Sequence, residues 1–244
     1  MFHIEIVESP KQIGEKAFEV IKGVLESSDA PVLGLATGSS PIPLYQAMIE
    51  DFKTSGRTYS HVTTFNLDEY VGISQSHSQS YHTFMKEHLF NHIDIDLNKV
   101  NLPNGSSADQ QAECDRYEKL LSDVSVDVQV LGIGSNGHIG FNEPGTPFTS
   151  TTHVITLKEQ TRQDNARFFA SIEDVPTQAI TMGIASIMKA KKILLIASTS
   201  YKANAIAAMI HGPITEECPA SILQTHPDVT VILDKEAARE LANG

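Results

Sequence analysis

The sequence contains no tryptophan and only two cysteines, and none of its apolar runs approaches the roughly 20 residues that cross a membrane. Cys114 and Cys218 stand far apart and lack metal-site spacing, so we expect neither a disulfide scaffold nor a cysteine-bound metal. So few cysteines favour a reducing compartment, and the N-terminus lacks a basic-then-apolar signal pattern. Together these features predict a cytoplasmic protein.

Positive charge is also scarce. The chain has 18 Lys and Arg residues against 30 Asp and Glu residues, which gives a net charge of −12. This balance argues against nucleic acid or an anionic membrane as the main partner. If an anionic small molecule binds here, the site must create positive potential locally.

Apolar, β-rich runs alternate with helical patterns along the whole chain. This alternation predicts βαβ units and an α/β fold with a mostly parallel sheet. Such sheets bind ligands at the carboxyl ends of their strands, near a topological switch point. The expected strands are 32–36, 63–67, 126–131, 153–157, 193–197 and 229–233, and the expected helices are 11–25, 41–52, 81–91, 107–122, 162–169 and 201–210.

The loop after the first of these runs reads Thr37-Gly38-Ser39-Ser40-Pro41. Glycine permits an unusual turn there, and proline suits the first helical position. Free backbone N–H groups, hydroxyls and a helix N-terminus together form an anion site. The alternative is a capped helix start with Ser39 or Ser40 as the N-cap. No G-K-[ST] follows, so the loop is not a P-loop.

Asp68 follows the strand predicted at 63–67. A short carboxylate at the carboxyl edge of a sheet can serve as a base. The alternative is a solvated acid, or a cap for the next element.

The loop at 132–144 begins with the dinucleotide fingerprint G-x-G-x-x-G. A true dinucleotide loop must open a helix, whereas the segment 142–147, Asn-Glu-Pro-Gly-Thr-Pro, breaks a helix almost at once. We therefore exclude NAD binding and expect the glycines to let a small ligand approach the backbone. His138 and Glu143 could pair on this loop as a base and its orienting group.

Two cations and a group of histidines complete the candidates. Lys202 lies at a helix start, where a cation opposes the macrodipole unless an anionic ligand is present, although a solvated lysine is the alternative. Arg167 lies on the segment 161–169. His88 and His92 have i, i+4 spacing, but no cysteine or clear carboxylate completes a metal set. We expect no metal.

Four segments together resemble the glucosamine-6-phosphate deaminase family: 35–41, 66–72, 132–144 and 161–169. The similarity continues through 181–184 into the helix that carries Lys202, so it covers nearly the whole chain. The resemblance implies one domain over residues 1–244, with a Rossmann-like open sheet, helices on both faces and a lid at roughly 155–182. The implied reaction converts glucosamine 6-phosphate and water to fructose 6-phosphate and ammonium, with no cofactor.

The resemblance also implies roles for individual residues. His138 would open the sugar ring while Glu143 holds its imidazole, and Asp68 would move a proton from C2 to C1. Asn136 belongs to the same catalytic set. The implied phosphate-binding residues are Thr37, Gly38, Ser39, Ser40, Arg167 and Lys202.

Two positions depart from the family pattern. Many members have an aspartate where this chain has Asn136, and an amide should stabilise the imidazolium less. Hexameric members activated by N-acetylglucosamine 6-phosphate carry basic residues just beyond the loop, where this chain reads His153-Val154-Ile155. We therefore predict no such activation, and a monomer or small homo-oligomer in place of a hexamer.

Two rival functions remain. A 6-phosphogluconolactonase would share the fold and a related histidine loop, but it needs no carbon base at Asp68. A sugar-phosphate sensing module of a transcription regulator needs a helix-turn-helix segment. The stretch before Val32 has room for one strand and one helix only.

Overall fold

A computed structural model gives the fold and describes residues 2–241. Within these residues, seven strands form one sheet in the order β1-β10-β9-β6-β2-β3-β5, and all its pairs are parallel. The predicted mostly parallel sheet is therefore confirmed. The strands are β1 (Phe2–Val7), β2 (Val32–Leu35), β3 (Thr63–Asn66), β5 (Val100–Asn101), β6 (Val128–Leu131), β9 (Lys192–Ala197) and β10 (Val229–Asp234).

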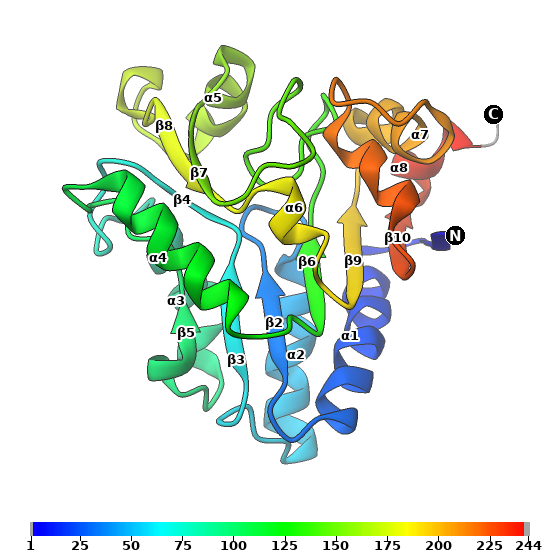
Figure 1. The fold of residues 1–244 in the computed structure, drawn as a ribbon. Coiled ribbons are helices and arrows are strands. Elements are labelled where there is room, and N and C mark those ends of the chain that lie inside the picture. Colours follow the sequence, from blue (N-terminus) through cyan, green and yellow to red (C-terminus); the bar gives the residue numbers. More distant parts are fainter. Residues whose placement is uncertain (1, 242–244) are drawn as a thin grey trace.

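Helices cover both faces of this sheet, with α1 and α2 on one side and α4 and α6 on the other (Figure 1). The longest, α1, begins after Ser9, whose hydroxyl accepts the Gln12 N–H, and has Pro10 in its first turn. The predicted helix 201–210 is in fact a 3-10 turn, η5 (Ser200–Lys202), followed by α7 (Ala203–His211). The other helices are α1 (Pro10–Ser27), α2 (Ile42–Ser55), α3 (Tyr81–His88), α4 (Gln110–Ser122), α5 (Glu159–Asn165), α6 (Ile184–Ile187) and α8 (Lys235–Ala238).

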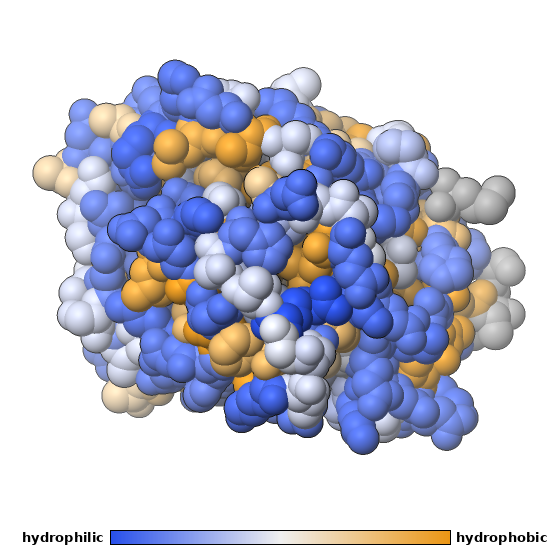
Figure 2. Space-filling view, turned by 90° about the horizontal axis from the view of Figure 1, so that it is seen from below, coloured by the Kyte–Doolittle hydropathy of each residue, from blue (hydrophilic) through white to orange (hydrophobic). Residues whose placement is uncertain are grey.

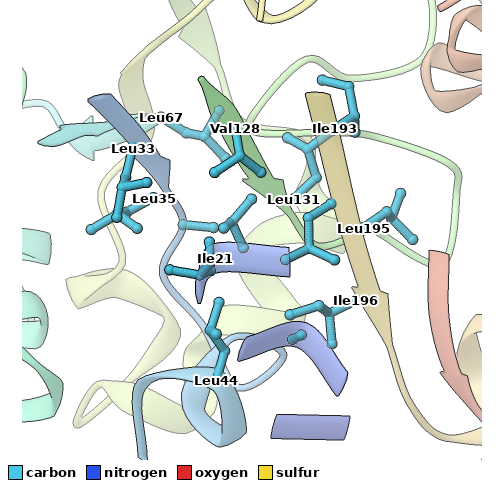
Figure 3. Packing of buried hydrophobic residues seen from close by; sticks show 14 of the residues in the cluster. Ile21, Leu33, Leu35, Leu44, Leu67, Val128, Leu131, Ile193, Leu195 and Ile196 are labelled. Atoms are coloured by element: carbon cyan, nitrogen blue, oxygen red, sulfur yellow. The ribbon is translucent and has the colours of Figure 1, made fainter. Parts of the chain in front are cut away.

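The core lies between the central strands and the helices on their faces. Leu33, Leu131 and Leu195 on β2, β6 and β9 are completely buried. Ile21 of α1 and Leu44 of α2 pack into the same cluster (Figure 3). Strands covered on both faces need continuous apolar runs, and each fully buried leucine or isoleucine contributes roughly 1.5–3 kcal/mol. This core fixes the strand ends from which the functional loops leave.

A second, antiparallel sheet has the order β4-β8-β7 and consists of β4 (Asp68–Tyr70), β8 (Gln178–Thr181) and β7 (His153–Thr156). The run at 153–157 therefore forms a strand as predicted, but outside the parallel sheet. The segment between β7 and β8, residues 157–177, carries α5 and the 3-10 turns η3 (Ala166–Phe168) and η4 (Ile172–Asp174). It stands above the carboxyl edge of the main sheet (Figure 1). We call residues 157–177 the lid; the predicted 155–182 includes strand residues at both ends.

The topological switch point of the sheet lies between the parallel neighbours β2 and β6, because the strands that follow them are added on opposite sides. After β2 it continues to β3 on one side, and after β6 it continues to β9 on the other. This arrangement opens a crevice at the carboxyl ends of the two strands, where doubly wound sheets bind ligands. The loops after β2, β3, β6 and β9 all reach this edge.

The opposite end of the molecule, seen from below in Figure 2, is mostly hydrophilic, and its hydrophobic residues form small separate patches. Among the helices within residues 2–241, none combines the length and the hydropathy that a membrane span requires.

Candidate active site

A cavity of about 320 Å³ lies at the carboxyl edge of the main sheet, beneath the lid. Its walls come from four post-strand loops, from the start of α3, and from α5 and η3 of the lid. Asn136 and Glu143 lie outside its lining. The lining includes eight of the ten predicted site residues: Thr37, Gly38, Ser39, Ser40, Asp68, His138, Arg167 and Lys202.

The loop after β6 is a closed turn that opens no helix. The Gly134 N–H donates to the His138 carbonyl at 2.9 Å, and the Gly137 N–H donates to the Gly134 carbonyl at 3.0 Å. Gly137 has φ +85°, which favours glycine. A Cβ on Gly134 would lie 2.2 Å from Nδ1 of His138. The space that we expected a ligand to use is therefore filled, at Gly134, by the imidazole itself.

Asn136 links the imidazole to Glu143. Its Nδ2 donates to Oε2 of Glu143 at 3.0 Å, and its Oδ1 lies 2.7 Å from Nδ1 of His138. The same Oδ1 accepts the His138 backbone N–H at 3.1 Å. Since a carboxylate only accepts, the amide must turn its NH2 group toward Glu143 and its oxygen toward the ring. Nδ1 then carries the proton, and Nε2 is the free basic nitrogen.

Glu143 is buried and acts on the imidazole mainly through that amide. Its Oε2 lies 3.8 Å from Nδ1 of His138, beyond hydrogen-bond distance. Its other oxygen accepts a hydrogen bond from Thr161 of the lid helix α5. The pairing of His138 with Glu143 is thus indirect, and Glu143 joins the catalytic loop to the lid.

The electrostatic surroundings keep His138 neutral at pH 7. Burial lowers its pKa below the usual value of 6.5, and the charge of Lys202 lowers it further, while Glu143 and Asp164 oppose the shift. A neutral imidazole with a free Nε2 can accept a proton from a sugar hydroxyl.

Asp68 begins β4 and is 6% exposed, so it is not the solvated acid of the alternative interpretation. Burial, followed by the charge of Glu69, raises its pKa to about 8. Its backbone pairs with Thr181 of β8, whereas its carboxyl group makes no hydrogen bond to any described residue. Its neighbour Glu69 is engaged, because it accepts the N–H groups of Tyr70, Tyr81 and His82.

The loop after β2 turns at Gly38, where φ is +85°. We predicted a helix that starts at Pro41, with Ser39 or Ser40 as its N-cap only in the alternative to an anion site. Instead, α2 starts at Ile42 with Pro41 at the N-cap and no side-chain cap. The two serine hydroxyls are therefore not used for capping and line the cavity, which favours the anion-site alternative.

Lys202 and Arg167 bring positive charge to the cavity. Lys202 ends η5 and is half-buried; burial lowers its pKa, Arg167 lowers it too, and Asp164 opposes. Arg167 lies in η3 of the lid and is exposed, with its guanidinium carbon 4.7 Å from the Phe168 ring centroid. Cations from the scaffold and from the lid thus face one space, as the predicted local positive potential requires.

A small set of contacts seats the lid over the cavity. The Phe169 ring centroid lies 5.7 Å from that of Tyr70, which in turn lies 4.9 Å from Tyr81. Arg162 of α5 donates to the carbonyls of Ile172 and Val175 and so links the two ends of the lid. Sequence reasoning missed Tyr81 and Asp164 in the cavity wall, as well as the bond from Thr161 to Glu143. The signal for Thr161 and Asp164 was their place in the segment 161–169.

Two of the helix histidines have protein partners. Nδ1 of His82 lies 2.9 Å from Oε2 of Glu69, and Nε2 of His92 lies 2.8 Å from the Glu87 carbonyl oxygen. Within residues 2–241, no three His, Cys, Asp or Glu side chains are grouped as a metal site would need. The absence of a metal remains a prediction.

Comparison with known proteins decides the family. The model of the family described as "Glucosamine-6-phosphate isomerases/6-phosphogluconolactonase" matches residues 8–232. The chain belongs to this family. It is 53% identical over 239 residues to a glucosamine-6-phosphate deaminase of Exiguobacterium sibiricum, covering 98% of this chain and 92% of that protein. A deaminase of Geobacillus sp. is 51% identical over 228 residues, covering 93% and 91%.

Solved structures of the family agree with this assignment. A monomeric glucosamine-6-phosphate deaminase superposes with a TM-score of 0.96 at 45% identity, covering 97% of this chain and 99% of that one. The 6-phosphogluconolactonase of Trypanosoma brucei has a TM-score of 0.83 at 20% identity, over 99% of both chains. The lactonase therefore shares the fold, and the deaminase shares both fold and sequence.

Proposed function

We propose that this protein is a glucosamine-6-phosphate deaminase, which converts glucosamine 6-phosphate and water to fructose 6-phosphate and ammonium. The observation that carries the proposal is one cavity that holds a buried carboxylate, Asp68, a neutral imidazole, His138, and two cations. Identity above 50% to deaminases over nearly the whole chain supports the same reaction.

The phosphate group is held at the turn after β2. The backbone N–H groups and hydroxyls of Ser39 and Ser40 donate to its oxygens at the N-terminal end of α2, and Lys202 neutralises part of its charge. Arg167 adds a guanidinium from the lid, with a fork geometry that suits phosphate. A protein of net charge −12 can thus bind an anion because these groups are concentrated in one cavity.

His138 opens the sugar ring. Nε2 takes the proton of the anomeric hydroxyl and delivers a proton to the ring oxygen as the C1–O5 bond breaks. In the imidazolium formed on the way, the Nδ1–H of His138 still donates to Oδ1 of Asn136. Glu143 accepts from the NH2 group of Asn136 and so fixes the orientation of the amide. The orienting contact is neutral where many family members supply a carboxylate.

Asp68 then moves one proton between adjacent carbons. Because its pKa of about 8 lies close to neutral pH, a fraction of this carboxyl group is ionised, and in that form it removes the C2 proton of the open-chain amino aldehyde. The resulting enolamine is protonated at C1. Water adds to the C2 iminium carbon, and ammonia leaves with a proton as ammonium. No oxidant or reductant is needed, since the aldehyde carbon is reduced as the amine-bearing carbon is oxidised.

Incubation with glucosamine 6-phosphate tests this proposal. We expect ammonium and fructose 6-phosphate in equal amounts. Absence of both products, with hydrolysis of 6-phosphogluconolactone instead, would replace the deaminase with the lactonase alternative.

Oligomeric state and location complete the proposal. We propose a monomer or small homo-oligomer, as in the monomeric deaminase that this chain resembles, without activation by N-acetylglucosamine 6-phosphate. A hyperbolic rate curve that this effector leaves unchanged is expected. Two free cysteines, one buried and one half-buried, support a reducing, cytoplasmic setting.

A further inference from the structure

Thr199 has a backbone conformation that threonine rarely adopts. It follows β9 by two residues, lines the cavity and has φ +76° and ψ 149°. Among the non-glycine residues that the structure describes, Thr199 alone has a positive φ. That region is essentially reserved for glycine, and a β-branched side chain is strained there. Such strain persists only where the surroundings impose it, and it clusters at functional sites.

The carboxylate of Asp234 binds the backbone of Thr199. Both of its oxygens accept the Thr199 N–H, at 3.1 and 2.9 Å. Asp234 ends β10, the strand paired with β9, so its side chain is held beside the place where β9 ends. Its Oδ1 also accepts the Ala237 N–H at 2.7 Å and caps α8. Asp234 does not line the cavity and therefore does not reach the substrate directly.

The conformation of Thr199 determines where Lys202 lies. With φ +76°, the chain leaves the direction of β9 and folds into η5, whose first bond runs from the Lys202 N–H to the Thr199 carbonyl at 3.2 Å. An ordinary extended residue would continue the line of the strand. The turn instead brings Lys202, half-buried, to the cavity wall, where burial lowers its pKa, Asp164 raises it and Arg167 lowers it. The position of the Lys202 ammonium group in the cavity therefore depends on the backbone conformation of the turn that carries it.

We propose that Asp234 is a positioning residue for substrate binding: it holds Thr199 in the left-handed conformation and thereby aims Lys202 at the substrate phosphate. The inference rests on the proposed function for the phosphate role of Lys202. It extends the functional set to an acid outside the cavity and to a strained residue at its edge. Sequence patterns give no sign of either, because a threonine in a Ser-Thr-Ser run reads as ordinary loop.

Asp234→Asn separates positioning from helix capping. Asparagine caps helices as well as aspartate does, so α8 keeps its cap. The substitution puts an NH2 group where Oδ2 accepts the Thr199 N–H at 2.9 Å, so that Thr199 keeps only the longer bond to Oδ1 at 3.1 Å and meets a donor on the other side. We expect KM for glucosamine 6-phosphate to rise about five- to tenfold, with kcat within about twofold of the parent value.

Thr199→Gly should restore the KM that Asp234→Asn raises if Asp234 acts by holding the Thr199 backbone. No such rescue is expected if Asp234 only stabilises the fold. Glycine adopts the required φ without strain. Adding Thr199→Gly to Asp234→Asn should bring KM back within about twofold of the parent value. Asp109→Ala is the matched control: Asp109 caps α4 outside the cavity, so its loss should lower the Tm and leave KM unchanged.

Lys202→Ala separates the two levels of the proposal. If Lys202→Ala raises KM while Asp234→Asn leaves it unchanged, or if Thr199→Gly gives no rescue, the positioning role is wrong and the phosphate site stands. If Lys202→Ala leaves KM unchanged, the phosphate role of Lys202 fails and the positioning role fails with it.

Discussion

The loops at the sheet edge and the lid contribute different things to the same cavity. Asp68 and His138 leave the ends of β3 and β6, whose residues are buried in the main core. Arg167 lies on the lid, is exposed, and reaches the cavity from a segment seated by a few contacts. The residues proposed for proton transfer thus follow strands of the buried sheet, and the cation proposed to bind phosphate lies on the lid.

This difference matters because the two tasks need different mechanics. Proton transfer between fixed atoms depends on sub-ångström placement, which a packed sheet provides. Entry of a phosphorylated sugar requires an opening, and closure then excludes water. Thr161 connects the two regions, since its hydroxyl donates from α5 to the carboxylate that orients the catalytic amide.

The largest effect is expected from Asp68→Asn. The variant lacks the carbon base, so kcat should fall about a thousandfold while KM changes little. Ammonium release measured against substrate concentration gives both constants. Activity of the variant within tenfold of the parent would remove Asp68 from proton transfer.

The same variant also tests the environment of Asp68. The folded protein keeps this proton up to a pKa of about 8, whereas the unfolded chain loses it near 3.8. Between these values the unfolded state binds fewer protons, so the free energy of unfolding falls as pH rises. Asp68→Asn should remove this slope and gain about 1–3 kcal/mol at pH 8. Denaturant unfolding at pH 5 and pH 8 measures it; equal slopes in both proteins would contradict the buried, protonated carboxyl.

Arg167→Ala should affect binding and leave the chemistry nearly intact. Loss of one charged hydrogen bond to phosphate should raise KM about tenfold, with kcat within about threefold. Lys119→Ala, an exposed cation of α4 outside the cavity, is the control and should leave both constants unchanged. A loss confined to kcat would place Arg167 in the chemical step.

Thr161→Val should loosen the connection between lid and catalytic loop. Valine keeps the shape but removes the donor, leaving a buried oxygen of Glu143 without this partner. We expect kcat to fall about fivefold, and Thr161→Ser to retain the parent rate because the hydroxyl remains. If valine and serine behave alike, the bond has no part in turnover.

Asn136→Asp should give the smallest effect at neutral pH and a clear one in acid. A carboxylate beside Nδ1 stabilises the imidazolium, so the pKa of His138 should rise by about one unit. The acidic limb of the kcat/KM profile should move up accordingly, with little change above pH 8. An unmoved profile would mean that His138 does not limit the rate in acid.

The sequence predicted most of the fold because its strands are buried on both faces. A short, continuous apolar run such as 193–197 predicts a strand that is covered on both faces of a sheet. Strand β9 confirms this prediction. The short strands β4 and β8 escaped prediction because their pairing depends on segments that are far apart in the chain. The run 153–157 was recognised as a strand, but its antiparallel partner was not readable from periodicity.

The residues of the candidate site were predictable where reactive or ligand-binding side chains lie on a loop directly after a strand. Eight of the ten predicted residues line one cavity: seven follow parallel strands that end at the same edge, and Arg167 reaches it from the lid. What lay beyond reach was how they act together. The amide of Asn136 stands between His138 and Glu143, and that order depends on a turn that spacing alone does not define.

Turnover of glucosamine 6-phosphate in D2O, followed by NMR, tests the central claim most directly. The account predicts that the parent protein forms ammonium and fructose 6-phosphate one for one, with the C2 proton carried to C1 and deuterium entering C1 only as far as the Asp68 proton exchanges with solvent before delivery. It predicts that Asp68→Asn, still able to bind substrate, forms neither product at a comparable rate. Formation of both products by Asp68→Asn at the parent rate would contradict it.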